Sequence, residues 1–159
     1  GGIDLEGMED MIAVHDVQLV EQQDGYQIIL KEKADSKYYF TMLIGPAEFA
    51  AIAKEKGTYR PPRPLTHDLY LGILKNLGIR FLRVEIYEQQ DNAYIANVFY
   101  EKDGNEVGVD SRPSDALALA LNQQIPILVR QKLFKTEVSK EEKEFYRDII
   151  KVVKFKETE

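Results

Sequence analysis

Two short segments of the chain combine an arginine, a proline and a carboxylate in the same order. One contains Arg63 and Asp68, the other contains Arg112 and Asp115, and in each a proline directly follows the arginine. A guanidinium group suits phosphodiester oxygens, because its planar N–H donors match them in pairs. A carboxylate can hold a divalent metal ion or act as a general acid or base. The two segments therefore predict chemistry on a phosphate group, with the arginines binding it.

Four carboxylates at or near predicted helix starts are the candidate metal ligands. We expect Asp68 and Asp115 to be the catalytic carboxylates, as ligands or as bases. Asp110 and Glu48 are the expected supporting ligands. Oxygen ligands of this kind are what Mg²⁺ or Mn²⁺ prefers. A structural alternative stays open, because an acid in the first turn also stabilises the helix dipole. The arginines have a parallel alternative, which is an ion pair with a nearby acid.

His67 lies between Thr66 and Asp68, in the first of the two segments. An imidazole gains and loses a proton near neutral pH, which suits a general base or a proton shuttle. The structural alternative is that the His67 ring only forms a hydrogen bond with a backbone group at the helix start. His67 is therefore the third candidate catalytic residue.

The composition narrows the classes of function. The formal net charge of −6 argues against a dedicated, electrostatically driven nucleic-acid binder, but it does not exclude a nuclease with a locally basic or metal-filled site. The chain has no cysteine and two histidines, which excludes disulfides, thiolate nucleophiles and histidine-rich metal clusters within one chain. No phosphate-loop or dinucleotide fingerprint is present, so no organic cofactor is expected. No apolar run approaches the ~20 residues of a membrane span, and we expect a cytoplasmic location.

The second segment leads into an apolar run, Ala116 to Leu121, that has no polar face. This pattern predicts a helix that is buried on nearly all sides. Asp110 or Ser111 is the expected N-cap, and Pro113 suits the first turn.

Three predicted strands followed by a proline-led helix occur twice, at roughly residues 11–56 and 80–122, and the first of these strands is expected from Met11 to Val20. The Asp24-Gly25 and Asp103-Gly104 pairs predict hairpin turns within these groups. Antiparallel meanders with helices between them favour an α+β fold with an internal βββα-like duplication over a doubly wound parallel sheet. At 159 residues we expect one domain, at 11–137, after a flexible segment at 1–10. A helical tail is expected at 138–159, because Ser139 and Glu142 have capping-box spacing.

The two arginine-proline segments, residues 63–69 and 110–116, resemble the two signature motifs of the bifunctional nuclease domain family. The order and spacing of the intervening strands are similar as well, and so is Leu43-Ile44-Gly45 followed by an acid at Glu48. The resemblance covers about residues 11–137. It implies a compact α+β domain with an internal duplication that self-associates, a dimer being favoured. It also implies the DNase and RNase activity ascribed to some members.

Two hypotheses follow. The first is a phosphodiesterase that cleaves DNA and RNA with divalent-metal assistance and without strong sequence preference. The second is a non-catalytic regulatory module that binds a ligand or a protein, in which the Arg-Pro…Asp turns are structural. One open cleft lined by the arginines, His67 and the two aspartates would favour the first. Aspartates that cap their own helices, with the arginines paired to them, would favour the second.

Overall fold

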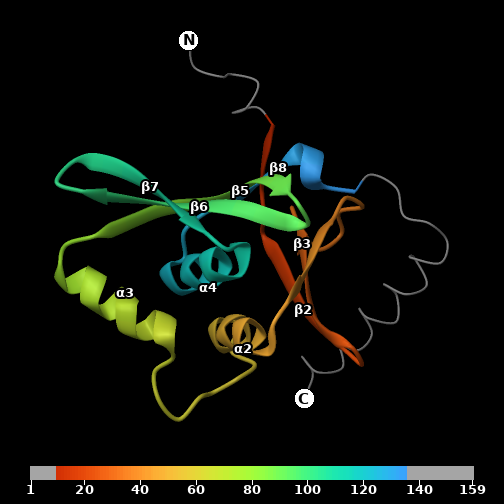
Figure 1. Ribbon diagram of the computed structural model, residues 1–159, viewed down its shortest axis with the longest axis horizontal. Helices are drawn as coiled ribbons and strands as arrows, with labels where there is room; N and C mark the ends of the chain where they lie inside the picture. Colours follow the sequence, from red (N-terminus) through yellow and green to blue (C-terminus); the bar gives the residue numbers. More distant parts are fainter. Residues whose placement is uncertain (1–9, 136–159) are drawn as a thin grey trace.

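The computed structural model describes residues 10–135, which form two β-sheets and three α-helices (Figure 1). In chain order the elements are β1 (Met11–Ala13), β2 (Asp16–Gln22), β3 (Gly25–Lys31), β4 (Phe40–Ile44), α2 (Pro46–Glu55), α3 (Thr66–Asn76), β5 (Arg80–Gln90), β6 (Ala93–Lys102), β7 (Asn105–Ser111), α4 (Pro113–Gln123), β8 (Ile127–Arg130) and the short 3-10 helix η1 (Gln131–Leu133).

The larger sheet has the strand order β1-β8-β5-β6-β7. Strands β5, β6 and β7 form an antiparallel meander, and two-residue turns join them at Asp91-Asn92 and Asp103-Gly104. All four turn residues have positive φ, the conformation that a tight hairpin of this length requires and that Asp, Asn and Gly tolerate best. β7 forms one edge of the sheet, and its side chains are exposed except for Ser111.

The smaller sheet, β2-β3-β4, is also an antiparallel meander. The sequence pattern predicts one strand from Met11 to Val20, and this prediction is wrong. β1 pairs with β8 in the larger sheet, whereas β2 pairs with β3 in the smaller one. Between them Val14 donates its N–H to Ile127 O, and His15 donates to carbonyls at the end of β3. The chain therefore passes from one sheet to the other at these two residues.

Helix α4 lies at the centre of the fold. Residues 116–120 are all buried, as the apolar run predicts, and they contribute to one core with both sheets. α4 packs on β5 and β6, and α2 and α3 pack against α4, so that the helices gather below the larger sheet in the view of Figure 1. Alanines of both α2 and α4 belong to this core, and their small side chains allow the two helices to approach closely.

The predicted N-cap of α4 is wrong. Arg112 occupies the N-cap position, and no side chain caps the helix. Asp110 and Ser111 still belong to β7, where they pair with Asn97 and Ala96 of β6. Their backbone therefore remains extended one or two residues before the helix begins.

The α+β fold with duplicated meanders is confirmed. Each meander, β2-β3-β4 and β5-β6-β7, is followed by a helix whose first residue is proline, Pro46 in α2 and Pro113 in α4. Strand β8 departs from a purely antiparallel arrangement, because it pairs in parallel with β5. Among the described residues, no helix combines the length and the apolar character needed to cross a membrane. The predicted tail helix after Ser139 lies outside the described residues.

Candidate active site

Arg112 joins the starts of α2 and α4. Its Nε and Nη2 donate to the two carboxylate oxygens of Asp115 at 2.8 and 3.1 Å, and its Nη1 donates to Glu48 Oε1 at 2.9 Å. These hydrogen bonds, first the ones to Asp115 and then the one to Glu48, raise the pKa of Arg112 above its ordinary value. The pKa of Glu48 is lowered by its own backbone N–H and by Arg112. Both ends of the Arg112–Glu48 pair are therefore charged at neutral pH.

A second group joins the end of α2, the start of α3 and the end of α4 around Glu55. Glu55 Oε2 lies 2.8 Å from His67 Nε2, 2.8 Å from Asn122 Nδ2 and 3.1 Å from Lys54 Nζ. The Lys54 ammonium also donates to Asp68 Oδ1 at 2.7 Å. The side chain of His67 is 7% exposed and that of Glu55 is 9% exposed, so these contacts are shielded from solvent.

The hydrogen bonds around Glu55 fix the tautomer of His67. Burial alone would raise the pKa of Glu55, but hydrogen bonds from His67, Asn122 and Lys54 lower it below the ordinary value. Glu55 is therefore a carboxylate, which only accepts hydrogen bonds, so His67 Nε2 must carry the proton that faces it. In the neutral ring Nδ1 is then an acceptor, and no described residue donates to it. Glu55 therefore holds the His67 imidazole so that Nδ1, the nitrogen that can accept a proton, has no hydrogen-bond donor among the described residues.

Asp68 has a largely structural environment. Its Oδ2 accepts the backbone N–H of Leu65 at 2.9 Å, which closes the start of α3, while Oδ1 binds Lys54. Burial alone would raise the pKa of Asp68, but the Lys54 and Leu65 hydrogen bonds lower it. Burial would also lower the pKa of Lys54, and the two carboxylates raise it instead. The pair therefore stays ionised.

A pocket of about 450 Å³ brings residues of both arginine-proline segments together. His67, Arg112 and Asp115 line it, with Glu48 and Tyr70. Small side chains from α2 and α4, among them Ala47, Ala50, Ala51 and Ala118, leave this space open. Burial, followed by the charge of Asp115, raises the pKa of Tyr70, so its hydroxyl remains protonated.

The other predicted residues lie apart from this pocket. Arg63 and Asp68 line an adjacent pocket of about 550 Å³, together with Lys54 and the proline-rich loop, and Tyr59 borders both pockets. Asp110 lines none of the pockets described for this chain and lies on the exposed edge strand β7. The four expected metal ligands therefore do not form one group: Glu48 and Asp115 face Arg112, and Asp68 faces Lys54.

Within the described residues, Glu55, His67 and Asp68 form the one group that could hold a metal ion, with a possible ligand atom from each lying within 4.8 Å of the others. The Lys54 ammonium lies within hydrogen-bond distance of both carboxylates. His67 Nε2 also carries a proton toward Glu55, whereas a metal ligand must offer a lone pair. In this arrangement the group therefore holds an ammonium and does not fit a divalent ion.

Sequence reasoning missed Glu55, together with its partners Lys54 and Asn122. One signal for Glu55 exists, because it is the last residue of α2. A carboxylate there faces the negative end of the helix dipole, which is unfavourable unless a partner compensates it.

Comparisons with known proteins identify the family of this chain. The family model described as the bifunctional nuclease domain matches residues 28–142. The chain belongs to the bifunctional nuclease domain family. The match includes all residues of both groups described above, and it extends beyond the described residues at its C-terminal end.

Relatives in this family come from bacteria and plants. An uncharacterized protein of Mycobacterium tuberculosis is 36% identical over 112 residues, which cover 70% of this chain and 66% of that protein. Bifunctional nuclease 1 of Oryza sativa subsp. japonica is 23% identical over 120 residues, or 74% of this chain and 36% of that protein. The match thus spans just under two thirds of the mycobacterial relative and about a third of the rice one.

Proposed function

We propose that this protein is a nuclease, a phosphodiesterase that hydrolyses DNA and RNA without strong sequence preference. The observation that carries the proposal is the pocket shared by His67 and Arg112. It combines a held imidazole, whose Nδ1 is free to accept a proton, with an exposed guanidinium. Family membership and the name of the rice relative support the same class of activity.

Arg112 is the phosphate-binding group of the proposal. Its side chain is 63% exposed, and its two terminal nitrogens each carry a further N–H that no described residue accepts. These N–H groups are available to phosphate oxygens in the pocket, where the positive charge stabilises the negative charge of the transition state. Ion pairs with Glu48 and Asp115 fix the direction of the guanidinium plane.

His67 is the general base of the proposal. Nδ1 takes a proton from a water molecule as the water oxygen attacks phosphorus. The bond from phosphorus to the leaving oxygen breaks, and the proton returns from His67 to that oxygen, so the step balances. Glu55 stabilises the imidazolium that forms in between. Because water is the nucleophile, the reaction needs no 2′-hydroxyl, which allows both DNA and RNA as substrates.

The loop between α2 and α3 extends the phosphate-binding surface. Lys54, Arg60 and Arg63 line the pocket of about 550 Å³ that adjoins the His67 pocket at Tyr59. This local group of cations offers a path for the strand backbone on a chain whose net charge is −6. Contacts of this kind bind phosphates and carry no sequence information, in line with a non-specific nuclease.

The sequence predicts a divalent metal ion, Mg²⁺ or Mn²⁺, but such an ion could bind at this site only after the side chains rearrange. A metal ion at Glu55, His67 and Asp68 would have to displace the Lys54 ammonium. The proposed mechanism therefore uses no metal ion and relies on Arg112 and on His67 with its partner Glu55. Cleavage that persists in EDTA supports it, and cleavage that requires added Mn²⁺ would show that the rearranged site is the active one.

The test of the proposal is cleavage of supercoiled plasmid and of single-stranded RNA by the purified protein. His67→Gln should lower the rate about 100-fold, the usual contribution of a general base. His15→Gln is the matched control, because it changes the other histidine of the chain, which is exposed and outside the site. Equal rates for the two variants would refute the role of His67 and point to a contaminating nuclease.

One observation favours the second candidate, a non-catalytic module that binds a ligand or a protein. Arg112 and Asp68 are both engaged in ion pairs, and Asp68 closes its own helix. Under this hypothesis the purified protein binds nucleotides or a partner protein but cleaves neither plasmid nor RNA at any metal concentration.

A further inference from the structure

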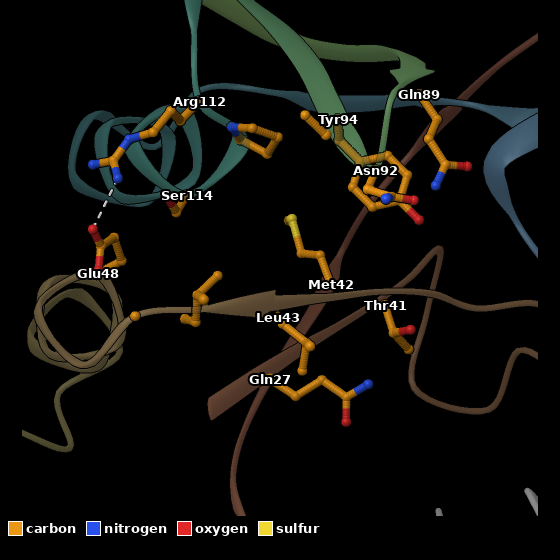
Figure 2. A pocket seen from close by; sticks show the side chains of 14 residues that line it. Gln27, Thr41, Met42, Leu43, Glu48, Gln89, Asn92, Tyr94, Arg112 and Ser114 are labelled. Atoms are coloured by element: carbon orange, nitrogen blue, oxygen red, sulfur yellow. Dashed lines mark hydrogen bonds and ion pairs between the residues drawn. The ribbon is translucent and has the colours of Figure 1, made fainter. Parts of the chain in front are cut away.

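A second pocket, of about 490 Å³, shares the Glu48–Arg112 ion pair with the pocket of His67. Its walls come from β4, the turn between β5 and β6, and the start of α4 (Figure 2). The hydrolytic step described above uses none of its other side chains. Its size lies within the range of about 300–1,000 Å³ that is common for small-molecule sites.

The two ends of this pocket differ in chemistry. Figure 2 shows Arg112, Glu48 and Ser114 at one end and Gln89 and Asn92 at the other. The first turn of α4, at Pro113 and Ser114, also lines the charged end, and no side chain caps that helix. The helix N–H groups that begin at Ser114 therefore lack a side-chain partner, and such groups favour an anion. The far end is uncharged and carries side-chain amides.

The middle of the pocket is formed by flat or flexible apolar groups. Met42 points into the space between the two ends, and Tyr94 lies beyond it (Figure 2). Met42 is 7% exposed, so its side chain forms part of the wall. Tyr94 is held in place by an edge-to-face contact with Phe40, with ring centroids 4.7 Å apart. A planar ring of a ligand can pack between the Met42 thioether and the Tyr94 ring.

The amides at the far end are available to a ligand. Gln89 and Asn92 are exposed and make no side-chain hydrogen bond within the described chain. Each amide offers a donor and an acceptor side by side, which matches the edge of a nucleobase. A simple anion would use only the charged end, and an apolar molecule would leave the charged pair and the amides without partners. A nucleotide satisfies both ends.

We propose that this pocket binds the nucleoside part of a nucleotide, with the base against Met42, Tyr94 and the amides, and the phosphate at Arg112. The inference rests on the proposed nuclease function and deepens it. Since Arg112 belongs to both pockets, a bound strand would place one base in the second pocket and the attached phosphate beside His67. The pocket thus positions the phosphate that is cleaved.

The test compares two probes that carry the same phosphate, adenosine 5′-monophosphate and ribose 5-phosphate. Binding is followed on the full chain by NMR of ¹³C-methyl methionine, and Met42→Leu identifies the Met42 signal among the three methionines. Adenosine 5′-monophosphate should shift the Met42 signal and bind about tenfold more tightly than ribose 5-phosphate, because the base stacks and pairs with the amides.

Variants separate the two ends of the pocket. Gln89→Ala combined with Asn92→Gly should remove most of the tenfold preference, and glycine tolerates the φ of +68° at position 92. Gln90→Ala is the matched control, because Gln90 is the neighbouring exposed glutamine and does not line the pocket. Arg112→Ala should weaken the binding of both probes.

The outcomes distinguish the inference from the proposed function. Equal affinities for the two probes, or a Met42 signal that stays fixed at saturation, overturn the inference even when the protein cleaves plasmid and RNA. A clear preference for adenosine 5′-monophosphate supports the inference, and it does so even when cleavage is absent and the nuclease proposal fails. A loss of preference in Gln90→Ala equal to that in the double variant also overturns it.

Discussion

Gly45 controls the position of Glu48, and with it the charge beside Arg112. A Cβ atom added at Gly45 would lie 2.5 Å from Glu48 Oε2. The backbone of Gly45 has φ −79° and ψ 168°, which alanine adopts without strain. In Gly45→Ala the flexible end of Glu48 must therefore move, and we expect this movement to break the hydrogen bond from Arg112 Nη1 to Glu48 Oε1. The variant therefore tests how the Glu48 charge affects phosphate binding at Arg112.

The expected cost in stability is small. Arg112 is 63% exposed and Glu48 22% exposed, and a pair of this kind contributes up to about 1 kcal/mol to the free energy of unfolding. Replacing glycine with alanine also restricts the unfolded chain, which offsets about 0.4–1 kcal/mol of any loss. We expect the free energy of unfolding of Gly45→Ala to stay within about 1 kcal/mol of the parent value.

The expected effect on phosphate binding is larger. If the Glu48 carboxylate lies about 4 Å from the bound phosphate, moving it away removes a repulsion of about 1 kcal/mol in water. The dissociation constant of ribose 5-phosphate should therefore fall about fivefold at low salt. Glu48→Gln should have a similar effect, because it removes the same charge. Titration followed by NMR or calorimetry at one fixed ionic strength measures the change.

Gly72→Ala is the matched control, because a Cβ at this position in α3 meets open space. The result that refutes the reasoning is a loss of phosphate binding or of cleavage by about tenfold or more in both Gly45→Ala and Glu48→Gln. Glu48 would then act as a supporting ligand, as the sequence predicts, and not as a competitor for Arg112.

Three further predictions follow from the same contacts. Lys54→Met should create a divalent-metal site at Glu55, His67 and Asp68, and electron paramagnetic resonance of bound Mn²⁺ should show tighter binding than in the parent protein. Folding lowers the pKa values of Glu55 and Asp68, so the two carboxylates stabilise the folded protein above about pH 5, and this stabilisation is lost as the pH falls through their folded-state pKa values. Melting temperatures between about pH 3 and 7 should therefore vary less in Glu55→Gln than in the parent. We also propose a dimer formed through exposed apolar residues at intervals of four along α3 and its C-cap, Leu69, Ile73 and Leu77. Sedimentation should show Ile73→Glu as a monomer, while Asn76→Glu, with the same charge on an exposed polar position, should sediment like the parent.

The sequence patterns predicted the elements with strong local signals. The run from Ala116 to Leu121 has no polar face, so burial of α4 was the outcome consistent with it. Asp-Gly at 103–104 predicted a tight hairpin, because these residues tolerate positive φ. The apolar residues on both sides of His15 and Asp16 were assigned to one strand, although the chain changes sheets at Val14 and His15. The strand partners that decide this change, β3 and β8, lie elsewhere in the sequence.

The sequence predicted several of the residues that line the pocket, but it predicted only some of the pairs that these residues form. Arg112 and His67 were expected to share a site, and the structure places both in one pocket. Lys54, the partner of Asp68, could not be predicted, because a salt bridge between two helices depends on how they pack. The same packing gives Glu55 its role, since its partners come from two other helices.

The exposed edge strand β7 also bears on how copies of this protein meet. An antiparallel pairing of two β7 strands that uses all seven residues would centre on Gly108. It would set Glu106 of each copy opposite Asp110 of the other, and like charges placed directly opposite each other are unfavourable. The strand thus carries its own protection against edge-to-edge aggregation, a common hazard of open sheets. A crowded solution of this protein should therefore resist forming β-linked fibres.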